Sequence, residues 1–285
     1  MSRKDKKISD MLGSMKRNGI ILTWFVVVAL VFVLLAKSFV LDKMDIEEML
    51  AAQLEQRQIE EVTIPSDVVN QRIDYKGFTV FFNRKTHMPN CVVYELTGKE
   101  TRGRSPRINN FEEDTSVAGC ARPWDYTQSG YDRGHMAPAG DLKWDSTAMA
   151  ESFRMTNVCP QRRSLNEGGW NRLEEKTREW ARRDSALTIV AGPIIGNNSR
   201  YIGEKGHRIP VPERFFKIIL SLYNGAPRAI AFIYDNKSCN RSLRDYATSV
   251  DEIEAITGFD FFSALPDEIE DEIESQNNIN AWLHP

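Results

Sequence analysis

The sequence predicts an α+β fold for the main part of the chain, with one apolar segment set apart near the N-terminus. Segments typical of strands and of helices follow one another without the regular strand–helix–strand order of parallel α/β proteins. The 285 residues are 41% hydrophobic and 27% charged, which is typical of a chain that folds around a core and excludes a disordered protein. The 17 glycines and 12 prolines follow no period, which excludes collagen-like and low-complexity architectures.

Charge and hydropathy divide the first 67 residues into three segments. Residues 1–19 contain six Lys or Arg against two Asp and predict a cytoplasmic tail. Residues 20–41 contain Lys37 as their only charged side chain and are long enough to cross a bilayer, so we expect a single-pass transmembrane anchor. Residues 42–67 are acidic and helix-prone, and we expect them to form a stalk or linker.

This arrangement of charge predicts an N-terminus in the cytoplasm and a domain over residues 68–285 on the non-cytoplasmic side, periplasmic or extracellular. A cleaved signal peptide is the alternative, but Ala36-Lys37-Ser38 is a poor cleavage site, so an uncleaved signal-anchor is favoured. Disulfides are allowed on that side of the membrane. The four cysteines permit several pairings and the sequence does not select one; they are Cys91, Cys120, Cys159 and Cys239.

Apolar periodicity and turn residues predict the elements of the 68–285 domain. Two strand candidates, 78–82 and 91–96, flank a turn-rich stretch and predict a hairpin. Residues 97–130 are rich in Gly, Pro, Asn and charge and predict long loops. The other expected elements are strands at 187–191, 215–222 and 229–234 and helices at 148–153, 165–183, 243–256 and 267–274.

Charge is also uneven within the domain. Residues 68–250 carry a net charge of +8, whereas residues 251–285 carry ten acidic side chains and no Lys or Arg. A basic region is compatible with a polyanionic partner, and an ordinary solvated surface is the simpler alternative. Contacts with such a partner are expected from residues 68–250.

Chemically versatile side chains are concentrated in the D-R-G-H sequence at 132–135. His135 is of the type that acts as a general base near neutral pH, and Arg133 offers a planar fork of donors for phosphate oxygens. Gly134 permits unusual backbone geometry, which would let both neighbours face one site. A lone histidine is more often structural, so this sequence alone does not establish catalysis.

Two further motifs follow the D-R-G-H sequence. They are Thr156-Asn157-Val158-Cys159-Pro160-Gln161 and Leu165-Asn166-Glu167-Gly168-Gly169-Trp170-Asn171-Arg172-Leu173-Glu174. In this order and spacing, the three motifs resemble the signature of the DNA/RNA non-specific endonuclease family. The resemblance covers roughly residues 74–275 and implies a ββα-metal nuclease domain, with a central antiparallel sheet flanked by helices. Cys159 departs from the family pattern, in which a small or hydroxyl residue is expected.

The resemblance also implies roles in phosphate chemistry. His135 would deprotonate a water molecule for attack on phosphorus, and Arg133 would bind the scissile phosphate. Asn157 would orient the site through its amide group. Arg107 is a weaker candidate for a further phosphate contact.

A divalent metal ion is implied as the cofactor, with Mg²⁺ expected and Mn²⁺ or another divalent cation as alternatives. Asn166 would be the one direct protein ligand of this ion. Glu174 lies eight residues further on, about 12 Å along a regular helix, and would instead accept hydrogen bonds from water bound to the ion. Asp132 and Gly134 would support the motif, and direct metal binding by Asp132 is the less favoured alternative.

The sequence therefore predicts a membrane-anchored, metal-dependent endonuclease that hydrolyses DNA and RNA without sugar preference. Because water rather than the ribose 2′-hydroxyl would attack, both substrates would be left with 5′-phosphate ends. Two alternatives remain open. One is a membrane-tethered module that binds or takes up nucleic acid without catalysis, and the other is a phosphodiesterase for a non-nucleic substrate. No GxSxG, Walker or HExxH motif indicates another class of enzyme.

Overall fold

The computed structural model describes residues 60–197, 199–222 and 227–283. The expected tail and anchor, and most of the expected stalk, lie outside these residues. Within them, no helix has both the length and the apolar character needed to cross a membrane. The strand β1 (Val62–Thr63) already belongs to the fold, because it pairs with β13 (Asp260–Phe261) and Val62 is buried in the core. The folded domain therefore begins before the boundary expected at residue 68.

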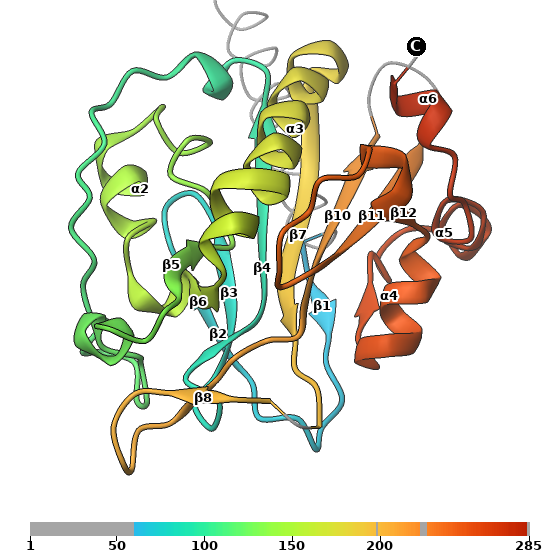
Figure 1. Ribbon diagram of the computed structural model, residues 1–285. Coiled ribbons are helices and arrows are strands. Elements are labelled where there is room, and N and C mark those ends of the chain that lie inside the picture. The colour runs from blue at the N-terminus through green and yellow to red at the C-terminus, as the bar shows by residue number, and fades with distance from the viewer. Residues whose placement is uncertain (1–59, 198, 223–226, 284–285) are drawn as a thin grey trace, which may run out of the picture. The chain divides into compact units, whose positions relative to one another are not determined.

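A seven-stranded antiparallel sheet forms the centre of the domain (Figure 1). Its strands, in spatial order, are β12 (Ala247–Thr248), β11 (Arg228–Asp235), β10 (Arg214–Ser221), β7 (Ala186–Ile194), β4 (Met88–Thr97), β3 (Thr79–Asn83) and β2 (Gln71–Asp74). The central strands are rich in the β-branched and aromatic residues that suit a buried sheet. The α+β class, the hairpin of β3 and β4, and the expected strands β7, β10 and β11 are confirmed.

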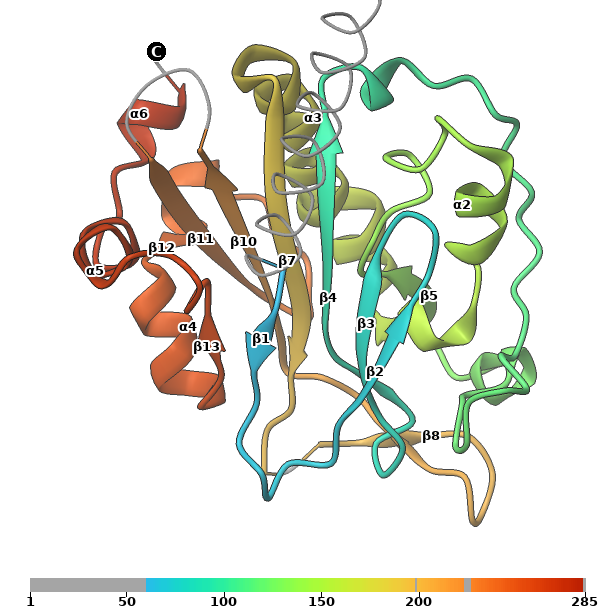
Figure 2. The same ribbon diagram turned by 180° about the vertical axis from the view of Figure 1, so that it is seen from behind.

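Helices cover both faces of this sheet. Successive strand residues point to opposite faces, so Phe215 packs in the cluster that includes α3 (Asn171–Asp184). Phe216 packs instead with α4 (Val250–Thr257) and α5 (Asp267–Glu274). The helix α3 crosses in front of β4 and β7 in Figure 1 and behind them in Figure 2.

The single helix predicted for residues 243–256 is wrong. Residues 243–256 form the 3₁₀ helix η5 (Leu243–Tyr246), the strand β12 and most of α4. Each helix has its own start, because Ser242 forms a capping box with Asp245 and the Ser249 side chain accepts a hydrogen bond from the Glu252 amide. The other short elements are η1 (Glu100–Arg102), η2 (Pro123–Tyr126), α2 (Ser146–Glu151), η3 (Met155–Asn157), β8 (Tyr201–Ile202), β9 (Ile209–Pro210) and α6 (Ile279–Leu283).

A separate pair of strands lies on the α3 side of the large sheet. The D-R-G-H sequence forms β5 (Asp132–His135), which pairs antiparallel with β6 (Val158–Gln161). A π-helical turn, η4 (Leu165–Trp170), then leads directly into α3. The three sequence motifs therefore fold into one unit of two strands and a helix, as the ββα expectation requires. Local propensity alone does not predict the strands β5 and β6.

The four cysteines are all buried and free, so none of the possible disulfide pairings is present in the structure. Cys159 lies in β6, where it is the register partner of Gly134. Complete burial raises the pKa of the Cys159 thiol well above its ordinary value. A buried, neutral thiol at this position acts as a small apolar side chain in the main hydrophobic cluster.

Candidate active site

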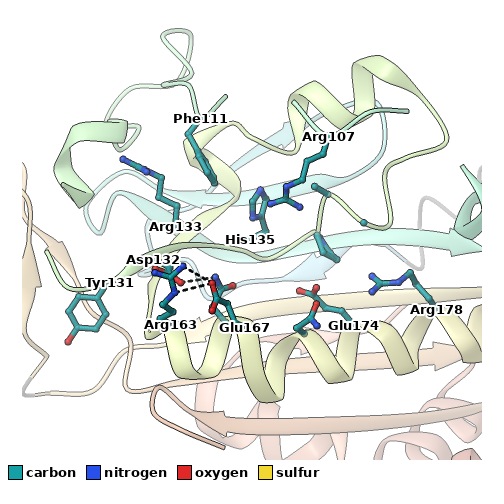
Figure 3. A pocket seen from close by; sticks show the side chains of 15 residues that line it. Arg107, Phe111, Tyr131, Asp132, Arg133, His135, Arg163, Glu167, Glu174 and Arg178 are labelled. Carbon is teal, nitrogen blue, oxygen red and sulfur yellow. Dashed lines mark hydrogen bonds and ion pairs between the residues drawn. The ribbon is translucent and has the colours of Figure 1, made fainter. Parts of the chain in front are cut away.

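A pocket of about 600 Å³ brings together side chains from three parts of the chain (Figure 3). One wall comes from residues 107–111, a second from residues 131–140 and the third from residues 163–178. Of the eight site residues predicted from the sequence, six line this pocket: Arg107, Asp132, Arg133, His135, Asn166 and Glu174. Gly134 and Asn157 do not.

His135 is the buried imidazole of the pocket. It is only 8% exposed, and its ring packs against Phe111 and Phe153 with centroid distances of 5.2 and 5.0 Å. Among the described residues, its Nε2 atom has no hydrogen-bond partner. Burial, helped by the positive charge of Arg107, lowers the pKa of His135 to about 3. The imidazole is therefore neutral at neutral pH and has an unpaired nitrogen.

Gly134 is required by the close approach of Gln161 and not by an unusual backbone angle. A Cβ atom at Gly134 would lie 2.3 Å from the Oε1 atom of Gln161 and 2.6 Å from its Cβ. The φ angle of Gly134 is not in the left-handed region, so the expected backbone role is wrong. Arg133 and His135 share a face of β5 simply because alternate strand residues do so.

Replacing Gly134 with Ala should therefore separate β5 from β6. Gln161 is fully buried, so the added methyl group can be accommodated only by moving the strand that holds His135. We expect a loss of about 1–3 kcal/mol in the free energy of unfolding and a melting temperature lowered by several degrees. Activity should fall at least tenfold (about 1.4 kcal/mol in barrier). Unchanged melting and cleavage rates would show that the strand pair has more room than this geometry allows.

Two arginines are held in place around the imidazole. Arg133 donates from Nε and Nη2 to the carbonyl oxygen of Pro123, at 3.2 and 2.6 Å, and its guanidinium lies 5.3 Å from the ring centre of Phe111. The Arg107 guanidinium lies 5.1 Å from the ring centre of Phe153. In Figure 3 Arg107 and His135 lie on the wall opposite α3. A guanidinium carries five N–H donors, so both arginines retain donors for a phosphate group in the pocket.

Asn166 lies in η4 and contacts Asp132 across the pocket floor. Its Nδ2 atom donates to the Oδ2 atom of Asp132 at 3.1 Å. This hydrogen bond uses the amide nitrogen and leaves the amide oxygen available as a ligand. The turn is wider than a regular helix, and Gly168 inside it has non-helical angles. The distance expected along a regular helix from Asn166 to Glu174 therefore does not apply, and both side chains line the same pocket.

Glu174 lies in the first turn of α3 among several charges. Burial raises the pKa of Glu174 to about 7, with a further contribution from the negative charge of Asp141. The positive charges of Lys217, Arg178 and Arg107 oppose this rise. The carboxyl group is thus close to half ionised at neutral pH before any cation is bound.

Asn157 lies behind the pocket. It is fully buried, and its Nδ2 atom donates to the carbonyl oxygens of Ala137 and Ser152, both at 2.9 Å. Its Oδ1 atom accepts a hydrogen bond from the Ala137 amide at 2.8 Å. The amide group therefore holds the backbone that directly follows His135, and it does not face the pocket.

Sequence reasoning missed three cationic residues in or near the site: Arg163, Arg178 and Lys217. Arg178 lines the pocket and donates from Nη1 to the Oδ1 atom of the buried Asp141 at 2.7 Å. Its position four residues after Glu174 on α3 was a detectable signal, because such residues share a helix face. Lys217 is fully buried in β10, with its ammonium 4.8 Å from the ring centre of Trp170. The signal for Lys217 was a charged residue within an otherwise apolar strand.

Four arginines, a neutral histidine and the oxygen donors of Asn166 and Glu174 surround one pocket on two strands and a helix. This arrangement is typical of enzymes that hydrolyse phosphate esters. The chain belongs to the DNA/RNA non-specific endonuclease family, whose model matches residues 55–268. Members of this family are divalent-metal-dependent nucleases.

Similar proteins include nucleases from several organisms. The mitochondrial Nuclease 1 of Schizosaccharomyces pombe is 31% identical over 223 residues, which cover 71% of this chain and 69% of that protein. A nuclease of Nostoc sp. is 34% identical over 212 residues, which cover 70% and 76% of the two chains. The mitochondrial Nuclease EXOG of Xenopus laevis is 31% identical over 240 residues, with coverages of 79% and 67%. The protein is therefore a nuclease.

The fold is also similar to that of a solved structure. A chain of the crystal structure of the EndoG/EndoGI complex superposes with a TM-score of 0.65 at 22% sequence identity. The match covers 70% of this chain and 88% of that one. This similarity supports the α+β architecture with a central antiparallel sheet.

Proposed function

We propose that the protein is a membrane-anchored endonuclease that hydrolyses DNA and RNA to 5′-phosphate ends, with Mg²⁺ as its cofactor. One observation supports this most strongly: His135, whose Nε2 atom has no partner among the described residues, lines a pocket together with Arg107, Arg133 and Arg178. These groups can act on a phosphodiester and its attacking water. Contacts made to the phosphate backbone carry no base information, which favours cleavage with little sequence preference.

In this proposal His135, the arginines and Asn157 have different roles. His135 Nε2 takes a proton from the attacking water, and the negative charge of a bound phosphodiester raises the pKa of the imidazole toward the range useful for a base. Arg133 and Arg107 hold the phosphate oxygens. Asn157 is a positioning residue, since it fixes the backbone next to His135 and does not face the substrate.

The oxygen donors present fit a hard divalent cation. Asn166 would hold the ion through its amide oxygen, with the amide nitrogen anchored on Asp132. Glu174 would accept hydrogen bonds from the water around the ion. When bound, Mg²⁺ would stabilise negative charge on the phosphate and on the leaving 3′-oxygen.

Cleavage of three substrates tests this function. The full chain, purified in detergent, should nick supercoiled plasmid and degrade single-stranded DNA and RNA with Mg²⁺, and should do neither with EDTA. The new ends should be labelled by polynucleotide kinase only after phosphatase treatment. Binding without cleavage, with Mg²⁺, Mn²⁺ or Ca²⁺ present, would favour the non-catalytic module. Hydrolysis of bis-p-nitrophenyl phosphate but of no nucleic acid would favour the non-nucleic phosphodiesterase.

The pKa of Glu174 predicts how metal affinity depends on pH. Only the ionised carboxylate supports the ion, and the pKa near 7 means that its ionised fraction grows about tenfold from pH 6 to pH 8. The apparent Mg²⁺ affinity, measured from metal titrations of the cleavage rate, should rise about tenfold over this range. Glu174→Gln should remove this dependence. Glu167→Gln is the matched control, because Glu167 is paired with Arg163 and its pKa is lowered. An unchanged pH dependence in Glu174→Gln would assign it to another group.

We also propose that residues 20–41 anchor the protein in the cytoplasmic membrane with the nuclease domain on the non-cytoplasmic side. The basic residues before this segment and the acidic residues after it support that orientation. Protease added to spheroplasts should digest the domain. Protection of the domain until the membrane is lysed would reverse the orientation.

A further inference from the structure

A cluster of three carboxylates lies on the face of the large sheet opposite the pocket. Carboxylate oxygens of Asp251, Glu254 and Glu274 all lie within 4.8 Å of one another. Asp251 and Glu254 are three residues apart on α4 and so share one side of that helix. Glu274 is the last residue of α5, which packs against α4; both helices are visible beside β11 and β12 in Figures 1 and 2.

Glu274 is buried without a protein partner for one of its oxygens. The residue is 5% exposed, and its Oε1 atom has no hydrogen-bond partner in the part of the chain that the structure describes. Its position at the C-terminal end of α5 is unfavourable for an anion, because the helix dipole is negative there. A buried carboxylate in such surroundings requires a positive charge or a proton.

The described part of the chain places no basic side chain in an ion pair with this cluster. The sequence contains no Lys or Arg after Arg244. Burial and four acidic neighbours raise the pKa of Glu274 to about 9, so without a cation this carboxyl group holds a proton at neutral pH. A cation that binds the cluster would have to displace this proton.

Other contacts hold the oxygen donors in position. Glu254 accepts a hydrogen bond from the amide of Phe261 at 2.8 Å through its Oε1 atom, which fixes this carboxylate against β13. Ile253 and Ile273, next to Glu254 and Glu274, are buried in the apolar cluster under the sheet and fix the two helices. Asp251 is exposed, so one side of the cluster is open to solvent. The donors are therefore preorganised and accessible to an ion.

We propose that Asp251, Glu254 and Glu274 bind a structural Ca²⁺ ion, distinct from the ion of the catalytic pocket. Ca²⁺ takes six to eight oxygen ligands at about 2.3–2.6 Å in flexible geometry, so two of its ligand atoms can be about 5 Å apart. This matches the spread of the three carboxylates. Water can complete the coordination on the exposed side of Asp251. Mg²⁺, with ligands at about 2.0–2.1 Å in strict octahedral geometry, fits the cluster less well.

A Ca²⁺ ion at this position would join the end of α5 to the first turns of α4. Both helices cover the sheet face that also receives β1 and β13. The ion would therefore stabilise this layer of the fold, and the catalytic pocket on the other face would not depend on it. Binding should raise the melting temperature without being needed for cleavage.

Calorimetry and thermal unfolding of the full chain in detergent test the proposal. The protein is stripped with EDTA and kept in saturating Mg²⁺, so that Ca²⁺ binding is measured with the pocket occupied. We expect one Ca²⁺ per chain and a melting temperature raised by several degrees at a hundredfold excess over the dissociation constant.

Three variants make the assignment specific. Glu274→Gln keeps the size of the side chain, and it should weaken Ca²⁺ binding at least tenfold and abolish the thermal shift. Asp251→Asn, at an exposed position, should also weaken binding and provides the test if the first variant does not fold. Glu272→Gln removes an exposed acid from the same helix and should bind Ca²⁺ like the wild type.

Several results would overturn this assignment. They are no saturable Ca²⁺ binding in saturating Mg²⁺, equal binding by the wild type and both cluster variants, or equal weakening by Glu272→Gln. A thermal stability that depends on pH but not on Ca²⁺ would show that a proton neutralises Glu274. Cleavage by Glu274→Gln at saturating Mg²⁺ should remain within twofold of the wild type. Its loss would tie the cluster to catalysis and contradict a separate structural site.

Discussion

Replacing His135 with Ala is expected to lower the cleavage rate by about 10²–10⁴-fold while leaving folding and nucleic-acid binding nearly intact. The Nε2 atom of His135 has no partner among the described residues, and His135 lines the same pocket as Arg107 and Arg133. Among the described residues, no other histidine lines the pocket, so no neighbour can replace it. The measurement is the rate of plasmid nicking at saturating Mg²⁺, with binding followed separately in Ca²⁺ or without metal.

Rescue by a small base separates the loss of a proton acceptor from the loss of packing. The Ala variant leaves a space between Phe111 and Phe153, and added imidazole should restore part of the activity. His135→Phe is the matched control, because it fills the same space and should not respond to imidazole. A rate for the Ala variant within tenfold of the wild type, a barrier difference of about 1.4 kcal/mol, would exclude the general-base role.

Asn166→Ala should raise the Mg²⁺ concentration needed for half-maximal cleavage far more than it weakens nucleic-acid binding. The amide oxygen is neutral, so an ion held by it keeps nearly its full charge for the phosphate. Asn166→Asp should restore metal binding but only part of the rate, since its charge would reduce the pull of the ion on phosphate. Glu174→Gln should be milder than Asn166→Ala, with a loss of about 10–100-fold.

Metal titrations of the cleavage rate distinguish these roles. Asn171→Ala is the control. Asn171 lines the same pocket, but its side-chain amide donates a hydrogen bond to Glu175 and is given no role in metal binding. It should keep the wild-type Mg²⁺ dependence. If Asn166→Ala keeps that dependence and Glu174→Gln loses it, the two residues have the opposite roles.

The apolar strands and the long helix of the fold could be predicted because their residues are buried in a regular pattern. Runs of β-branched or aromatic side chains predict five strands of the sheet: β3, β4, β7, β10 and β11. Strands β5 and β6 could not be predicted in this way. They are four residues each, and β5 consists of Asp, Arg, Gly and His, which local propensity assigns to a loop.

At the site, too, the sequence predicted the motif residues but not their surroundings. The motif residues were found by their order in the sequence, but the burial that lowers the pKa of His135 depends on Phe111 and Phe153, which lie outside the motifs. Lys217 on β10 and Arg178 on α3 act on Glu174 through their positive charges. Only the folded sheet brings the buried Lys217 close enough to affect Glu174, so this electrostatic effect could not be predicted from spacing.

The pairing of β1 with β13 has a mechanical consequence. Val62 and Thr63 are paired with Phe261 and Asp260, and not with the seven-stranded sheet. A force applied to the domain from its N-terminal side would therefore act first on the β1–β13 pair. The strand pair β5–β6, which carries His135, lies on the other face of the large sheet and does not pair with β1 or β13.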